Sequence, residues 1–168
     1  MSNQKHEATV TPVKDALNRV RSTADYQFGK GVGAKLFPEN VDILYSKATG
    51  RIRYINSDGK RLATLRPTDG LLSLSIAGTQ RIVENATSAQ CFVTVQNEVA
   101  QFIAKGGDVF AAHIVKADDA IHAKDEIVVL DETDKVLAVG RAILSSAEMQ
   151  AFKIGAAVKV RHGAASES

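Results

Sequence analysis

Hydrophobic residues in the first part of the chain recur with the period of a helix. Four of them lie at i, i+3, i+4 and i+7 and so share one helix face: Val13, Ala16, Leu17 and Val20. Just before this face, Thr11 suits the N-cap and Pro12 the first helical position, where the missing N–H of proline costs nothing. The pattern predicts a helix that ends at a flexible, glycine-rich loop over residues 29–33.

The next stretch changes to short apolar runs that are typical of strands. Turn-forming residues separate these runs, for example Asn56-Ser57-Asp58-Gly59. The predicted strands cover residues 41–46, 51–55, 61–65 and 72–76, and a short helix covers 77–84. This part of the chain is therefore predicted to be α+β, with a helix packed on an antiparallel sheet.

Residues 85–90 are polar and rich in turn formers, and they mark a boundary between two domains. Beyond them short strands alternate with short helices, and Ser145 and Glu148 form a capping box that starts the last helix. The predicted strands cover residues 91–95, 109–115, 126–130, 136–143 and 157–161, and the helices cover 97–104 and a short segment ending at 152. Many short strands with few helical turns indicate a mostly β fold, a small and nearly closed barrel.

The two predicted domains, at 11–86 and 90–163, account for nearly all of the 168 residues. The polar segments outside them, residues 1–10 and 164–168, lack periodicity and are expected to be disordered. Charge is unevenly spread, because residues 1–90 carry 13 Lys and Arg against 8 Asp and Glu, whereas the remainder carries 8 against 11. This small imbalance hints at one surface that faces a polyanion.

Composition and spacing argue against several classes of function. Cys91 is the only cysteine, so an internal disulfide and a zinc cluster of cysteines are excluded, and its apolar neighbours favour a buried, inert thiol. No apolar run approaches the roughly 20 residues that span a bilayer, and we expect a soluble protein of the cytoplasm. The four histidines lack metal-ligand spacing and no nucleophile motif is present, so we expect no catalytic residue, metal or cofactor.

Basic residues beside glycines or on strands are the remaining candidates for binding. Lys105-Gly106-Gly107 follows a predicted helix; glycine caps a helix cheaply, and bare N–H groups beside a lysine also let a phosphate approach. Arg51 and Arg53 are two residues apart, so a strand places them on one face, with Ile52 and Tyr54 on the other. Such a face is either solvated or phosphate-binding. With six Phe and three Tyr in all, the chain does not favour recognition by base stacking.

The second domain resembles a known family over about residues 91–163. Residues 102–115, FIAKGGDVFAAHIV, resemble the helix, glycine loop and strand of PUA domains. The central and closing strands of that family are similar to KDEIVVLD at 124–131, LAVGRA at 137–142 and GAAVKVRHG at 155–163. The resemblance implies a PUA-type pseudo-barrel that binds RNA.

The first domain indicates which group of PUA-domain proteins this chain resembles. The segments ADYQFG at 24–29, SKATGRIR at 46–53 and LRPTDG at 65–70 are similar to the small domain that precedes the PUA domain in archaeal archaeosine tRNA-guanine transglycosylases. In that family the PUA domain grips the acceptor stem and 3′ end of tRNA, and base exchange takes place in a separate zinc-containing barrel. A barrel of this kind needs about 250 residues, more than the 168 residues of this chain.

The resemblance therefore implies a non-catalytic, tRNA-binding subunit whose partner is a separate catalytic transglycosylase subunit. A free-standing RNA-binding module that serves another RNA-modifying enzyme or the ribosome stays open, whereas an enzyme in its own right is disfavoured because no catalytic constellation is found. The binding residues that the resemblance implies are Lys105, Gly106, Gly107, Phe110, Arg141, Arg161 and His162, with Lys47, Arg51 and Arg53 as weaker candidates.

Overall fold

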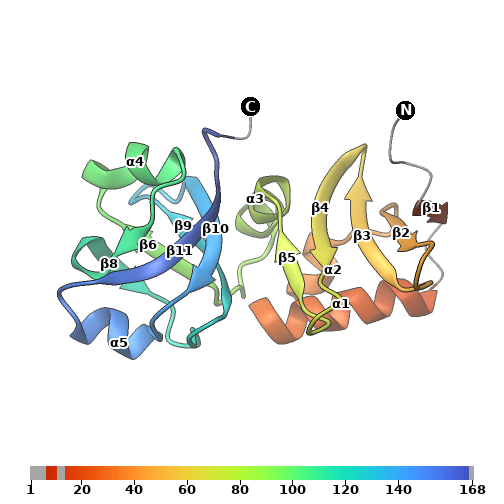
Figure 1. Ribbon diagram of the computed structural model, residues 1–168, viewed down its shortest axis with the longest axis horizontal. Coiled ribbons are helices and arrows are strands. Elements are labelled where there is room, and N and C mark those ends of the chain that lie inside the picture. Colours follow the sequence, from red (N-terminus) through yellow and green to blue (C-terminus); the bar gives the residue numbers. More distant parts are fainter. Residues whose placement is uncertain (1–6, 11–13, 167–168) are drawn as a thin grey trace. The chain divides into compact units, whose positions relative to one another are not determined.

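The computed structural model describes residues 7–10 and 14–166 (Figure 1). The chain forms two compact units, residues 1–86 and 87–168. The first unit is an antiparallel meander in the order β1-β2-β3-β4-β5, accompanied by helices, and the predicted α+β class is confirmed. Its elements are β1 (Glu7–Val10), α1 (Lys14–Phe28), α2 (Val32–Leu36), β2 (Asp42–Ser46), β3 (Ile52–Ser57), β4 (Lys60–Leu65), β5 (Leu72–Leu74) and α3 (Ile76–Asn85).

Helix α1 packs through the apolar face that the sequence predicts and extends that face by two turns. Its buried residues are Ala16, Leu17, Val20, Ala24 and Phe28. The last turn is tied to β5 because the side chain of Gln27 donates to the carbonyl of Leu72 (3.0 Å) and accepts from the Leu72 N–H (2.6 Å). The predicted helix start, residues 11–13, lies outside the described part of the chain.

The glycine-rich segment after α1 is a tight turn at residues 29–31 that leads directly into helix α2, so the predicted loop over 29–33 is wrong at its last two residues. Helix α2 packs against α1, and the Gly33 N–H donates to Asp25 Oδ1 (2.6 Å). A side chain at position 33 would overlap the backbone carbonyl of Arg21. Glycine is therefore required here for close approach of two helices, and its low helix propensity is overcome by packing.

Strand β3 contains a bulge that changes which residues share a face. Ile52 lies opposite Tyr45 on β2 and Tyr54 lies opposite Leu44, so Arg53 is the extra residue of the bulge. Ile52 is buried, whereas Tyr54 is half-exposed beneath the guanidinium of Arg61, 3.4 Å from its ring centroid. The expectation that Ile52 and Tyr54 share a face is therefore wrong.

The second unit is a curled, mixed sheet in the order β7-β11-β10-β9-β6-β8, in which β6 pairs with β9 in parallel and the other pairs are antiparallel. Its elements are β6 (Phe92–Val95), η2 (Asn97–Val99), α4 (Ala100–Ala104), β7 (Val109–Phe110), η3 (Ala111–His113), β8 (Ile114–Ala117), β9 (Glu126–Leu130), β10 (Val136–Ala142), α5 (Ser146–Ala151) and β11 (Ala156–Gly163).

The sheet is nearly closed because its two edge strands are consecutive in the chain. Only η3 separates β7 from β8, so the two edges must come close together and the sheet curls into a barrel (Figure 1). The predicted single strand at 109–115 is thus interrupted by a 3₁₀ turn. The mostly β, PUA-type pseudo-barrel class is confirmed, and so is the capping box of Ser145 and Glu148 at the start of α5.

The described parts of the two segments that were expected to be disordered, residues 7–10 and 164–166, have defined structure. Residues 7–10 form β1, which pairs with β2. After β11, Ala164 N–H donates to the carbonyl of Leu137 (2.8 Å) and Ala165 N–H to that of Ala104 (2.9 Å). The polar composition of these segments misled the prediction because the hydrogen bonds that hold them use backbone groups, which every sequence supplies.

The cysteine is buried in the second unit, as the sequence predicts. Burial raises the pKa of the Cys91 thiol far above its ordinary value, and the nearby carboxylates of Asp118 and Glu126 raise it further. The reactive thiolate is therefore disfavoured. In the part of the chain that the structure describes, no helix is long and apolar enough to cross a membrane.

We predict that Gly33→Ala lowers the free energy of unfolding by about 1–3 kcal/mol, because the new methyl group would force α2 away from α1. Chemical denaturation of the wild-type and variant chains measures this difference. Ala34→Ser, at an exposed position of the same helix, is the control and should leave the stability nearly unchanged. Equal stability of Gly33→Ala and wild type would contradict the packing described here.

Candidate nucleic-acid interface

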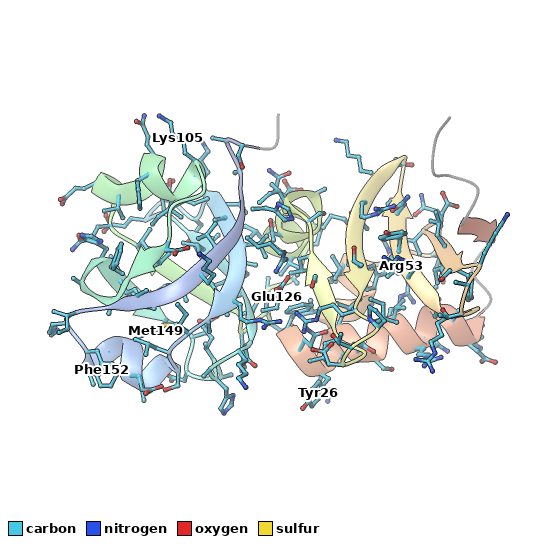
Figure 2. All side chains as sticks on the ribbon, viewed as in Figure 1. Tyr26, Arg53, Lys105, Glu126, Met149 and Phe152 are labelled. Atoms are coloured by element: carbon cyan, nitrogen blue, oxygen red, sulfur yellow. The ribbon has the colours of Figure 1, made fainter. Side chains whose placement is uncertain are left out.

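The Lys105-Gly106-Gly107 segment is a complete helix C-cap. Gly106 N–H donates to the carbonyl of Ile103 (2.9 Å) and Gly107 N–H to that of Phe102 (3.0 Å), with Gly106 in a left-handed conformation at φ 107°. The backbone N–H groups are thus satisfied within the cap, and the expectation that they are bare is wrong. Lys105 itself is exposed at the end of α4 (Figure 2). The segment offers a phosphate a lysine and little steric bulk.

This cap is held against the end of β11. A side chain at Gly163 would overlap the carbonyl of Ala104, and its Cβ would lie 2.7 Å from the Gly106 nitrogen, so only glycine allows the two segments to touch. The neighbouring Asp108 accepts from the Val160 N–H at 2.9 Å. The structure therefore brings the cap and the exposed His162, which precedes Gly163, to one end of the barrel.

Phe110 lies at the opposite end of β11 from the cap. It is 44% exposed and pairs with Ala156, the first residue of β11, whereas Gly106 contacts Gly163, the last. A strand rises about 3.3 Å per residue, so roughly 20 Å of β11 separates the two positions. The residues implied by the resemblance thus line a strip along β11, which we call the β11 strip, and do not form a compact pocket.

Arg161 lies near the cap end of the β11 strip, and a buried carboxylate holds its guanidinium group. Its Nη1 donates to Glu126 Oε1 (2.8 Å) and its Nη2 to Oε2 (2.5 Å), a bidentate pair. The side chain of Glu126 is completely buried, whereas a third of the Arg161 side chain is exposed. Arg161 is the extra residue of a bulge, because Val139 pairs with His162 and Gly140 with Val160. The bulge lets its side chain extend across β10 to β9.

Two further basic residues stand beside this ion pair. Arg141 is exposed and pairs across β10 and β11 with Lys159, whose Nζ lies 3.5 Å from Asp108 Oδ2. Neither Arg141 nor Lys105 takes part in an ion pair within the described residues. Arg141 and Lys105 therefore carry the positive charge of the strip that no described carboxylate offsets.

Sequence reasoning missed two exposed residues next to the predicted set. Lys159 is two residues before Arg161, and this strand spacing was the available signal. Phe102, in the helix predicted over residues 97–104, is 57% exposed and lies over Gly107, while the neighbouring Ile103 enters the core. A helix this short presents only one or two positions to the core, so its pattern of apolar residues is ambiguous.

The weaker candidates lie in the first unit. Lys47 and Arg51 are exposed in the turn between β2 and β3, and Arg53 is the bulged residue of β3 (Figure 2). Arg51 and Arg53 line a cleft of about 630 Å³ together with Arg19 and Arg66, neither of which was among the predicted site residues. Lys47 is not among the residues that line it.

Each unit matches the model of a known family. Residues 18–88 match the patch-forming domain C2 of tRNA-guanine transglycosylase, and residues 92–164 match the PUA domain. The chain is a transglycosylase C2 domain followed by a PUA domain. The resemblance drawn from the sequence motifs is confirmed.

The C2 and PUA domains together correspond to the C-terminal part of longer archaeal proteins. The chain is 40% identical to the tRNA-guanine(15) transglycosylase of Methanothermobacter thermautotrophicus over 159 residues, which are 95% of the chain and 24% of that protein. It is 42% identical to the enzyme of the same name from Methanobrevibacter smithii over 89% of the chain and 23% of that protein. The chain thus spans about a quarter of the length of these relatives.

Solved structures show the same fold over both domains. A hypothetical protein from Pyrococcus horikoshii superposes with a TM-score of 0.74 at 22% identity, over 94% of each chain. A PUA domain protein from Aeropyrum pernix superposes with a TM-score of 0.68 at 17% identity, over 94% of this chain and 86% of that one. At these identities the likeness establishes the fold.

We predict that Arg161→Ala destabilises the PUA domain by about 3–5 kcal/mol, because it leaves the charge of Glu126 buried without a partner. Thermal and denaturant unfolding measure the change. Adding Glu126→Gln to Arg161→Ala should recover part of the loss, since the amide removes the buried charge. The control is Arg141→Ala, which removes an exposed charge on the adjacent strand and should change stability by less than about 0.5 kcal/mol. Equal effects of the two arginine variants would refute a structural role for the pair.

Proposed function

We propose that this chain is a tRNA-binding subunit that does no chemistry of its own and works with a separate catalytic transglycosylase subunit. The observation that carries the proposal is the match of both domains to tRNA-guanine(15) transglycosylases, confined to the quarter of those enzymes that corresponds to C2 and PUA. Base exchange is assigned to the partner, and recognition of the acceptor stem and 3′ end of tRNA to this chain.

The β11 strip is the surface proposed to hold the RNA. Exposed positive charge from Lys105 and Arg141 suits the phosphate backbone, and the half-exposed ring of Phe110 suits a nucleotide at the other end of the strip. Gly106 leaves open space beside Lys105, Gly107 lets the ring of Phe102 lie close to the cap, and His162 borders the same cap. Arg161 is assigned a mixed role, in which its pairing with Glu126 fixes the strand and its exposed edge faces the RNA.

We predict that the chain binds tRNA with salt-sensitive affinity and that Lys105→Glu weakens this binding. Each lost phosphate contact should reduce the slope of log Kobs against log salt concentration by about 1. Titrations of tRNA at several salt concentrations, with melting curves for each variant, provide the measurement. Lys116→Glu is the matched control, because Lys116 is an exposed lysine of the same domain on β8, outside the cap and the predicted site residues.

Three results of this titration would each count against a part of the proposal. Undetectable tRNA binding by the wild-type chain at low salt would exclude autonomous recognition. Equal affinities of the Lys105→Glu and Lys116→Glu variants for tRNA would show that the helix cap is not part of the RNA-binding site. Unfolding of Lys105→Glu would show that Lys105 stabilises the domain, in contrast to its exposed position at the end of α4.

We also predict that the chain alone exchanges no guanine but raises kcat/KM for tRNA when it is added to a transglycosylase lacking its own C2 and PUA domains. The gain comes from binding energy at the acceptor end, remote from the exchanged base. Guanine exchange is measured with intact tRNA and with tRNA lacking its 3′ end, with and without this chain. Trimming the 3′ end should remove most of the gain.

The two negative outcomes of this assay have different meanings. Exchange by the chain alone would end the non-catalytic assignment. A truncated transglycosylase that ignores the chain would favour the alternative, a free-standing RNA-binding module for another RNA-modifying enzyme or for the ribosome.

A further inference from the structure

Four arginines of the C2 domain converge on one surface cleft of about 630 Å³. They come from three different segments: Arg19 from α1, Arg51 and Arg53 from the turn and strand after β2, and Arg66 from the turn after β4. In an antiparallel meander the β2–β3 and β4–β5 turns lie at the same end of the sheet, and here both lie beside α1 (Figure 1). Topology thus gathers charges that are up to 47 positions apart in the sequence.

One arginine of the cleft, Arg66, is fixed in position by neighbouring side chains. Arg66 forms two contacts with Asp69, Nε to Oδ1 at 3.1 Å and Nη2 to Oδ2 at 2.9 Å, and its Nη1 donates to Ser73 Oγ at 3.4 Å. Its side chain is mostly buried. An arginine held from both sides loses little freedom when it binds a further group, so its position is set before a ligand arrives.

Positive charge in the cleft exceeds negative charge. No aspartate or glutamate is among its described lining residues, and Asp69, which pairs with Arg66, is not one of them. Arg19 and Arg51 take part in no ion pair in the part of the chain that the structure describes. Like charges gathered in this way repel one another, and the repulsion is relieved when an anion binds. The cleft is therefore built for an anionic ligand.

We propose that this arginine cleft of the C2 domain binds RNA backbone phosphates, as a second RNA site in addition to the β11 strip of the PUA domain. The inference rests on the proposed RNA-binding function and adds Arg19 and Arg66 to the residues that serve it. Guanidinium groups recognise phosphate oxygens through paired N–H donors. The rim also supplies the hydroxyl groups of Ser46 and Thr49. Contacts of these kinds fix position and carry no base identity.

Two features favour an RNA segment over a small free anion. The volume of about 630 Å³ is in the range of pockets for molecules larger than a single phosphate. The lining also includes the apolar residues Ile52 and Leu65, which suit the carbon atoms of a sugar. No aromatic side chain is among the described lining residues, so stacking of a base is not part of the recognition. A stretch of sugar and phosphate satisfies all of these conditions.

The test compares two double variants of the full chain that each remove two positive charges from the C2 domain. The variant Arg19→Ala/Arg51→Ala removes two exposed arginines from the cleft. The variant Lys35→Ala/Lys60→Ala removes two exposed lysines that lie outside it. The salt dependence of tRNA binding is measured for both. We expect the cleft variant to reduce the slope of log Kobs against log salt by about 2, and the control to leave it near the wild-type value. All four positions are exposed, so both variants should keep the wild-type melting temperature.

Each outcome decides between distinct possibilities. Equal slopes for the cleft variant and the control would overturn the arginine cleft, and a loss of affinity in Lys105→Glu within the same series would show that the proposed RNA binding still stands. Absence of tRNA binding by wild type would overturn both. A competition with inorganic phosphate, against chloride at matched ionic strength, separates the sources of the anion. If millimolar phosphate, but not chloride, removes the difference in tRNA affinity between the wild type and the cleft variant, the cleft is a small-anion site and the RNA assignment is refuted.

Discussion

The PUA domain is organised around one buried charge. Glu126 lies at the start of β9, in the middle of the sheet, where an ionised carboxylate without a partner would cost several kcal/mol. Arg161 supplies the partner from two strands away, and the bulge opposite Val139 and Gly140 gives its side chain that reach. The pair therefore specifies the register of β9, β10 and β11 together, because a slip of one residue would separate the two charges.

The same interaction determines what the β11 strip can offer to RNA. Arg161 and Lys159 face carboxylates of Glu126 and Asp108, so a count of basic residues overstates the attraction of the strip for phosphate. The C2 domain differs, because four of its arginines converge on a cleft whose described lining residues include no aspartate or glutamate. This contrast agrees with the excess of basic residues in the first 90 positions. The distribution of carboxylates, more than the number of arginines, decides where a polyanion binds.

Local chemistry could be predicted from the sequence, and longer-range geometry could not. The capping box of Ser145 and Glu148 uses atoms three residues apart, and the apolar face of α1 follows from helical period, so both were predicted. Helix α2 was missed because its glycine serves packing against α1, which no local pattern encodes. The bulge at Arg53 inverted the faces of β3 because one inserted residue shifts every side chain that follows.

The candidate site shows the same division. A glycine loop beside a lysine was found from its motif, but its N–H groups proved to be satisfied within the cap, which depends on the exact conformation of Gly106. The partner of Arg161 is 35 residues away and the arginines of the cleft are spread from 19 to 66, so no spacing rule joins them. A cluster of this kind arises from chain topology. In a meander every second turn returns to the same end of the sheet, and a basic residue in each such turn is sufficient to concentrate charge there.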